Sequence, residues 1–313
     1  MKSYCFGIDV GGTSVKCGLF LTNGTLVEQW EIPTRLENNG SSILPDVADA
    51  IKTKLDERGI TKDNVDGVGI GIPGPVNENG EVPMAVNLHW GFKAVASELS
   101  ALTGLPAKAA NDANIAALGE AWKGAAEGAK NVILVTLGTG VGGGIILGGK
   151  MLSGVNGAGG EIGHIQVNDD ETEVCGCGRK GCLEQYTSAT GIVRMANTLL
   201  NTTDRPSALR NVQYVSAKEV FDAAKQGDEL AAEIVDRHGK CLGKALAQIA
   251  CVVDPEVFVI GGGVSKAGTI ITDTTEKYFK EYAFHACKNT KFTLATLGND
   301  AGMYGGACAI MND

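Results

Sequence analysis

The chain has 313 residues, of which 44% are hydrophobic and 20% charged, the balance of a globular protein long enough for two domains. Its net charge of −9 disfavours non-specific binding to nucleic acid, because no positive field attracts the phosphate backbone. Since no signal-like segment precedes the first strand and no apolar run approaches the ~20 residues of a membrane span, we expect a cytoplasmic protein that binds neither membranes nor nucleic acid.

Apolar and alternating segments predict the elements of the first half. In chain order they are three strands over 4–31, a helix over 41–58, a strand over 65–71, a helix near 93–103, a strand near 107–110 and an alanine-rich helix opened by Asn111-Asp112.

The second half begins like the first. Residues 131–149 predict a strand, a glycine turn and a strand, as residues 6–20 do, which indicates a weak internal repeat. The remaining elements are a cysteine-rich loop, helices over 188–200, 216–226 and 228–252, a strand and glycine turn over 256–265, a helix over 268–286, a strand over 291–297 and a helix over 300–311. Strands that alternate with helices indicate the α/β class.

Three glycine turns follow apolar strands. They are Asp9-Val10-Gly11-Gly12-Thr13, Gly138-Thr139-Gly140 and Gly261-Gly262-Gly263. Successive backbone N–H groups in such turns can bind phosphate, and a carboxylate at a strand tip, such as Asp9, can hold Mg²⁺. A single turn could equally be a hairpin without a ligand. Two phosphate-type turns in a repeated layout favour a nucleotide cleft. A dinucleotide site is rejected, because a strand and not a helix follows Gly138.

Three cysteines and a histidine form a candidate metal site. Cys175, Cys177 and Cys182 have the spacing C-x-C-x4-C, and His164 lies eleven residues before the first of them. Four such ligands complete a closed, structural zinc site. The alternatives are a reduced cysteine-rich turn without metal and a zinc ribbon for nucleic acid, which the acidic residues between 169 and 173 disfavour.

Seven motifs in this order resemble the ROK sugar kinases over nearly the whole chain. They are DVGGTSVK, GIGIPGPV, NDANIAALGE, LGTGVGGG, GAGGEIGH, CGCGRKGCLE and VIGGGVSKAG. The resemblance implies the actin/hexokinase-like ATPase fold, with two related α/β domains that flank a cleft, and a dimer or tetramer. It places residues 1–112 plus 300–313 in a small domain and 113–299 in a large one that carries the zinc-binding loop, 161–184.

The resemblance also implies roles for single residues. Asp112 is expected to be the general base, and Asn111, Glu161, His164 and Glu184 to contact sugar hydroxyls. One ring nitrogen of His164 would bind zinc while the other faces the sugar. The nucleotide base would lie near Gly261-Gly262-Gly263. From the residues alone, Asp112 could instead simply cap its helix.

The expected activity is ATP-dependent phosphorylation of glucose to glucose 6-phosphate, because NDANIAALGEAWKG and GVNGAGGEIGHI most resemble the members that use glucose. The alternatives are a kinase for another hexose, such as N-acetylmannosamine or fructose, and a sugar-binding regulator without kinase activity. Loss of zinc is expected to abolish sugar binding and to leave the phosphate turns unaffected.

Overall fold

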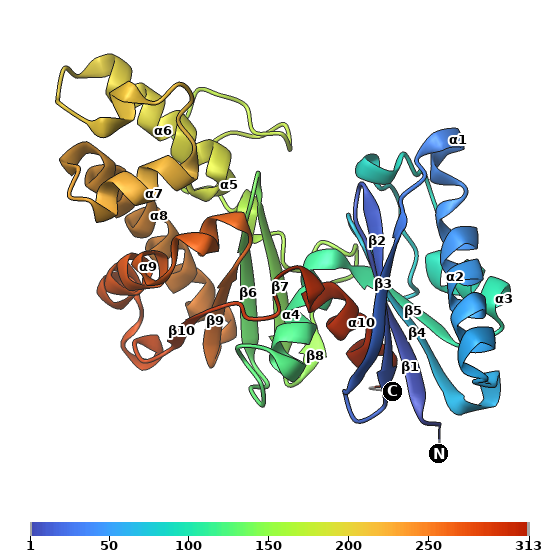
Figure 1. The fold of residues 1–313 in the computed structure, drawn as a ribbon. Helices are drawn as coiled ribbons and strands as arrows, with labels where there is room; N and C mark the ends of the chain where they lie inside the picture. The colour runs from blue at the N-terminus through green and yellow to red at the C-terminus, as the bar shows by residue number, and fades with distance from the viewer. Residues whose placement is uncertain (1, 312–313) are drawn as a thin grey trace. The chain divides into compact units, whose positions relative to one another are not determined.

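A computed structural model describes residues 2–311, so residues 312 and 313 of the expected small domain lie outside the described part. The chain divides into two compact units (Figure 1). The first comprises Met1–Lys130, Gly144–Gly160 and Thr296–Asp313, and the second comprises Asn131–Gly143 and Glu161–Ala295.

The first unit is built on a five-stranded sheet in the order β3-β2-β1-β4-β5. The first three strands are antiparallel neighbours, whereas β4 and β5 run parallel to β1. A tight turn at Asn23-Gly24 joins β2 to β3. Gly24 takes a positive φ of 93°, and Asn23 Oδ1 accepts a hydrogen bond from the Thr25 N–H at 2.9 Å. The bounds are β1 Tyr4–Val10, β2 Ser14–Leu21, β3 Leu26–Pro33, β4 Val65–Ile72 and β5 Ala107–Asn111.

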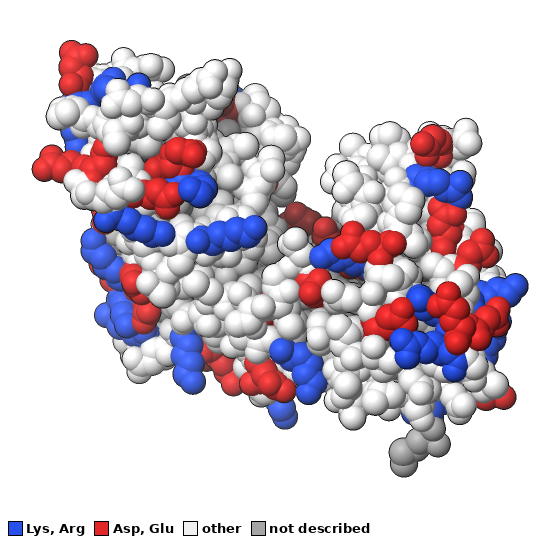
Figure 2. All heavy atoms as spheres, in the orientation of Figure 1, with Lys and Arg blue, Asp and Glu red and all other residues white. Residues whose placement is uncertain are grey.

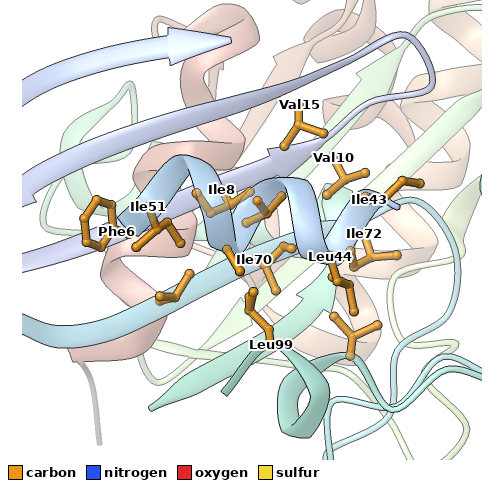
Figure 3. Packing of buried hydrophobic residues seen from close by; sticks show 14 of the residues in the cluster. Phe6, Ile8, Val10, Val15, Ile43, Leu44, Ile51, Ile70, Ile72 and Leu99 are labelled. Carbon is orange, nitrogen blue, oxygen red and sulfur yellow. The ribbon is translucent and has the colours of Figure 1, made fainter. Parts of the chain in front are cut away.

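One face of this sheet is covered by α2 (Ile43–Arg58) and α3 (Val95–Thr103). The apolar residues of α2 recur at helical spacing and are buried, and Gly59 in the left-handed region ends the helix. In Figure 3, Ile51 of α2 lies near Phe6 of β1, and Ile43 of α2 lies near Val10 of β1 and Ile72 of β4.

The opposite face is covered by α10 (Ala301–Met311), the expected terminal helix of small residues. A Cβ on Gly69 of β4 would collide with the backbone of Gly306, so helix and sheet touch without side chains between them. A Cβ on Gly305 would likewise collide with the Ile115 carbonyl of α4 (Asp112–Lys123).

These contacts bear on the domain division. The expected boundary assigned 113–299 to the large domain, whereas α4 and residues 144–160 belong to the first unit in the structure. The reason is close packing: a Cβ on Gly144 would collide with the carbonyl of Ala113, and α4 packs against α10.

The second sheet repeats the layout of the first. Its order is β10-β9-β6-β7-β8, so β6 to β10 occupy the places that β1 to β5 occupy in the first sheet. As there, the last two strands run parallel to the first strand of the set. The internal repeat seen in the sequence thus corresponds to a repeated strand order. The bounds are β6 Val132–Leu137, β7 Val141–Leu147, β8 Lys150–Met151, β9 Val257–Gly261 and β10 Lys291–Leu294.

Two expected elements of the second unit are shorter in the structure. The strand over 291–297 ends at Leu294, and the helix over 268–286 ends at Tyr282. The helices not yet given are α1 Glu37–Gly40, α5 Glu184–Thr187, α6 Ala189–Thr202, α7 Ala217–Lys225, α8 Glu229–Val253 and α9 Thr269–Tyr282. The 3₁₀ helices are Lys62–Asn64, Val86–Leu88, Ile162–His164, Ala208–Asn211, Gly263–Ala267, His285–Cys287 and Gly298–Asp300.

On the face drawn in Figure 2, Asp and Glu side chains lie among Lys and Arg side chains. Within residues 2–311, no helix combines the length and apolar character that a membrane span requires.

Candidate active site and metal centre

Two carboxylates meet at one edge of the first sheet. The strands β1, β4 and β5 are parallel, so their carboxyl ends share an edge, and there Asp9 pairs with Gly71 and Ile72 with Asn111. A Cβ on Gly71 would lie 3.4 Å from Asp9 Oδ1 and 3.7 Å from the Asp112 Cα. The fold therefore brings together two residues that are about a hundred positions apart in the sequence and that were both expected in the site.

Asp9 has a raised pKa. Burial, together with the neighbouring charges of Asp112 and Asp300, raises the pKa of its carboxyl group to about 7, against the opposing charge of Lys16. A divalent cation would stabilise the carboxylate form, so the residue fits the expected magnesium site.

Lys16 of β2 contacts the segment that leads into α10. Its ammonium group donates to the carbonyl of Asn299 at 3.0 Å and to Asp300 Oδ1 at 3.2 Å. Sequence offers no signal for this pairing, because the partners are more than 280 positions apart.

Asn111, and not Asp112, caps α4. Asn111 Oδ1 accepts from the Asn114 N–H at 3.1 Å, and Asn111 Nδ2 donates to the Gly74 carbonyl at 3.0 Å. Asp112 is the first helical residue, and its Oδ1 accepts from the Ala113 N–H at 2.8 Å. The interpretation of Asp112 as a mere cap is therefore disfavoured, because another side chain performs that task.

The first glycine turn joins β1 to β2. The Gly11 N–H donates to the Ser14 carbonyl at 2.9 Å, and the Gly11 carbonyl accepts from Thr34 Oγ1 at 2.7 Å, which fixes the base of the turn. Gly12 and Thr13 are exposed at its tip.

The second and third glycine turns lie side by side in the second unit, since they follow the parallel neighbours β6 and β9. Gly262 has a φ of 82°, and a Cβ there would contact the backbone of Leu137, the residue before the second turn. Thr139, Gly262 and Gly263 are exposed, whereas Gly261 is buried. As expected, a strand and not a helix follows the second turn.

The four expected metal ligands converge. The ligand atoms of His164, Cys175, Cys177 and Cys182 all lie within 4.8 Å of one another. His164 Nδ1 lies 3.8 Å from Cys175 Sγ, and Cys177 Sγ lies 3.6 Å from Cys182 Sγ. Three sulfurs and one imidazole nitrogen grouped in this way fit a tetrahedral zinc ion.

The local fold explains how the loop closes. Residues 175–178 form a turn in which the Gly178 N–H donates to the Cys175 carbonyl at 2.8 Å, and Gly178 takes a φ of 84°. A backbone hydrogen bond from Arg179 lowers the pKa of Cys177 to about 6, whereas burial raises the pKa of Cys182 to about 12.

An ion-pair network supports the acidic part of this loop. The Arg194 guanidinium donates to Glu171 at 2.7 Å and to Glu173 at 3.0 Å, and together with the Tyr186 hydroxyl it lowers the pKa of Glu171 to about 2. The acidic residues that argued against a zinc ribbon therefore fix the loop.

The other two acids expected to bind sugar flank the metal ligands. Glu161 is exposed, and its Oε2 lies 4.0 Å from His164 Nε2, on the opposite ring nitrogen from the cysteines. Glu184 is partly buried, with Oε1 3.7 Å from Cys175 Sγ and Oε2 accepting from the Val141 N–H at 3.0 Å. The structure thus groups Glu161, His164 and Glu184 around the metal cluster, and it groups Asn111 and Asp112 with Asp9.

A family model for the ROK family matches residues 5–313. The chain belongs to the ROK family. A glucokinase from Halalkalibacterium halodurans is 44% identical over 96% of this chain and 92% of the relative. An N-acetyl-D-glucosamine kinase from Salmonella paratyphi B is 31% identical over 98% and 99% of the two chains.

Solved ROK structures share the two-domain α/β fold. The crystal structure of a ROK family glucokinase from Streptomyces griseus, in complex with glucose and AMPPNP, has a TM-score of 0.74 and 33% identity, with 98% of each chain covered. The expected actin/hexokinase-like fold with two related α/β domains is thereby confirmed.

Proposed function

We propose that this ROK protein phosphorylates glucose with ATP to give glucose 6-phosphate. The observation that carries the proposal is the proximity of Asp112 to Asp9 at the carboxyl ends of parallel strands, beside a glycine turn. The 44% identical glucokinase relative and the glucose and AMPPNP complex of the Streptomyces griseus protein support the substrates.

In the proposed mechanism Asp112 is the general base, which accepts the proton of the reacting sugar hydroxyl as the phosphoryl group is transferred. Asn111 holds a neighbouring hydroxyl. Because its Oδ1 and Nδ2 already bond Asn114 and Gly74, its side chain is held in one orientation. Glu161 and Glu184 accept further sugar hydroxyls, a task suited to carboxylates, which offer several lone pairs. With Nδ1 of His164 on the metal, its Nε2–H would donate to a sugar oxygen.

The glycine turns would bind the nucleotide. Backbone N–H groups and the hydroxyls of Thr13 and Thr139 would contact the phosphates, and residues Gly261–Gly263 would lie near the base. Asp9 would hold Mg²⁺, directly or through water, which supplies charge neutralisation for phosphoryl transfer.

We also propose that His164, Cys175, Cys177 and Cys182 hold a structural zinc ion, which would fix the loop and take no part in the chemistry. Metal analysis of active protein purified without chelators should find about one zinc per chain, as a closed four-ligand site requires. Active protein that carries no zinc would contradict this assignment.

A coupled assay of ATP consumption across a panel of hexoses tests the function. The panel should include N-acetylglucosamine, because the Salmonella relative is a kinase for that sugar, together with N-acetylmannosamine and fructose. We expect the highest kcat/KM with glucose. A higher value with another hexose would revise the acceptor, and turnover with polyphosphate in place of ATP would revise the donor. Tight sugar binding without turnover would instead indicate a regulator.

A cytoplasmic location and a homo-oligomeric state remain predictions.

A further inference from the structure

The carboxylate of Glu184 lies between the metal ligands and the second glycine turn. Its Oε2 accepts from the Val141 N–H at 3.0 Å, and its Oε1 lies 3.7 Å from Cys175 Sγ. It also fills the space beside Gly140: the three heavy atoms nearest to a Cβ built on this glycine belong to Glu184. One side chain therefore touches both a proposed zinc ligand and a proposed phosphate-binding turn.

The residues just after Glu184 hold the same turn from its other side. The Ala189 N–H donates to the Gly138 carbonyl at 2.8 Å, and Thr190 Oγ1 donates to the Thr139 carbonyl at 2.8 Å. The segment 184–190 begins two residues after the ligand Cys182. The turn 138–141 is therefore bonded by the segment 184–190, whose first residue contacts the metal cluster.

We propose that Glu184 is a positioning residue that couples metal binding to nucleotide binding through the turn 138–141. The inference rests on the proposed function and deepens it. With the metal bound, the cluster fixes residues 175–184, Glu184 stays on Val141, and the turn keeps the shape that receives phosphate. Without the metal this end of the loop loosens, and the turn loses its support. This proposal differs from the expectation that zinc loss leaves the phosphate turns unaffected, and the experiment below decides between them.

The test measures the affinity for AMPPNP with Mg²⁺ by calorimetry, without sugar, on zinc-loaded protein and on protein treated with a zinc-selective chelator. We expect the affinity to fall about 5- to 10-fold on zinc removal, within the usual range of coupling between sites. By reciprocity, saturating AMPPNP should raise the affinity for zinc by the same factor, which is measured on folded protein by chelator competition. This second measurement guards against unfolding of stripped protein. Equal nucleotide affinities, or no effect of nucleotide on zinc affinity, would overturn the proposal.

Gly140→Ala isolates the coupling, because its methyl group displaces the Glu184 carboxylate and leaves every metal ligand intact. In this variant the ratio of the zinc-loaded to the stripped affinity should approach one. Gly138→Ala is the matched comparison in the same turn, since a Cβ there meets no atom within 4 Å. Whatever the absolute affinity of Gly138→Ala for AMPPNP, its ratio of zinc-loaded to stripped affinity should equal that of the wild type. If Gly140→Ala keeps that ratio as well, Glu184 is not the coupling residue.

The glucose assay distinguishes failure of the proposed coupling from failure of the proposed function. Loaded wild-type protein that phosphorylates glucose but shows no coupling would refute only this inference. Absence of turnover with every hexose would refute the proposed function, while the effect of zinc on AMPPNP binding could still be measured.

Discussion

Neighbouring side chains at the start of α4 have separate tasks. Asn111 bonds the helix N-terminus and the Gly74 carbonyl, so it fixes the direction in which α4 begins. Asp112, one residue later, lies beside Asp9 and raises its pKa. The NDAN motif was enough to predict that both residues are in the site. It could not predict which of them caps the helix, because both types are common caps.

The substitution Asp112→Asn tests the proposed base. The amide cannot accept the hydroxyl proton, so we expect kcat to fall about 10²- to 10⁴-fold while glucose affinity changes only a few-fold. Asp63→Asn, at an exposed site in a 3₁₀ helix of the same unit, should leave both unchanged. Turnover and sugar binding are measured separately, by coupled assay and calorimetry. Near-normal kcat in Asp112→Asn would remove it from the mechanism.

His238 of α8 is buried, with Nε2 donating to the Thr187 carbonyl at 3.1 Å. Burial lowers its pKa from 6.5 to about 4. As the pH falls below 6.5 the unfolded chain takes up the proton first, so this residue stabilises the fold above that pH and loses its contribution between 6.5 and 4. The loss amounts to about 2 kcal/mol between pH 7 and pH 5.

Urea unfolding at these two pH values measures that contribution. His238→Gln should show a smaller loss of stability on acidification than the wild type, by about 2 kcal/mol. His285→Gln, at an exposed position, should keep the wild-type difference. An unchanged difference in His238→Gln would show that this histidine is not kept neutral by burial.

At the scale of the element, features set by residues close together in the sequence were easier to predict than contacts between distant residues. The helix α2 and its glycine end, and the capping box of Ser216 and Glu219 on α7, follow from residues within a few positions of one another. The contact between Glu184 and Val141 spans 43 positions, and no local pattern encodes it. The strand β10 is shorter than its apolar pattern suggested, because the chain bends at Thr296 to bond Glu120.

Glu120 of α4 is fully buried and accepts backbone hydrogen bonds from two other segments. The N–H groups of Ala125, Thr296 and Leu297 donate to its two carboxylate oxygens at 2.8, 3.2 and 2.9 Å. It thereby joins the end of α4 to the segment that leads into α10. No role was predicted for Glu120 from the sequence, because a glutamate in a helix is usually exposed.

Glu120→Ala should therefore destabilise the protein. Three backbone N–H groups would lose their acceptor and the buried site of the carboxylate would be left empty, at a cost of about 2–4 kcal/mol, which denaturant unfolding can measure. Glu127→Ala is the control, since Glu127 is exposed and its carboxylate lies 3.5 Å from the Lys123 ammonium group; it should change stability by less than about 0.5 kcal/mol. Equal effects of the two substitutions would contradict the anchoring role.

At the scale of the whole molecule, the two sheets have the same strand order, and each carries glycine turns at the carboxyl ends of its parallel strands. Sequence revealed this repeat as a layout of strand, turn and strand. The division of the chain was harder to predict, because it depends on glycines that allow backbones to touch. Gly305 against Ile115 and Gly144 against Ala113 hold three separate segments in the first unit.

Gly305→Ala tests this backbone contact. The added methyl group would push α10 away from the carbonyl of Ile115, and we expect a loss of about 1–3 kcal/mol in the free energy of unfolding. Gly91→Ala, where a Cβ would meet nothing within 4 Å, should have almost no effect. Thermal unfolding compares the two. A stable Gly305→Ala protein would mean that the helices can separate without cost.

The place of α10 has a consequence for biosynthesis. The ribosome makes β1 to β5 before residues 301–311, yet these later residues cover a face of the first sheet. The first unit therefore cannot complete its core until residues 301–311 have been made. The second unit, whose residues stop at Ala295, can be complete before that moment. In nascent chains stalled before residue 301, the second unit should thus resist proteolysis better than the first. The unit whose strands are made earlier becomes stable later.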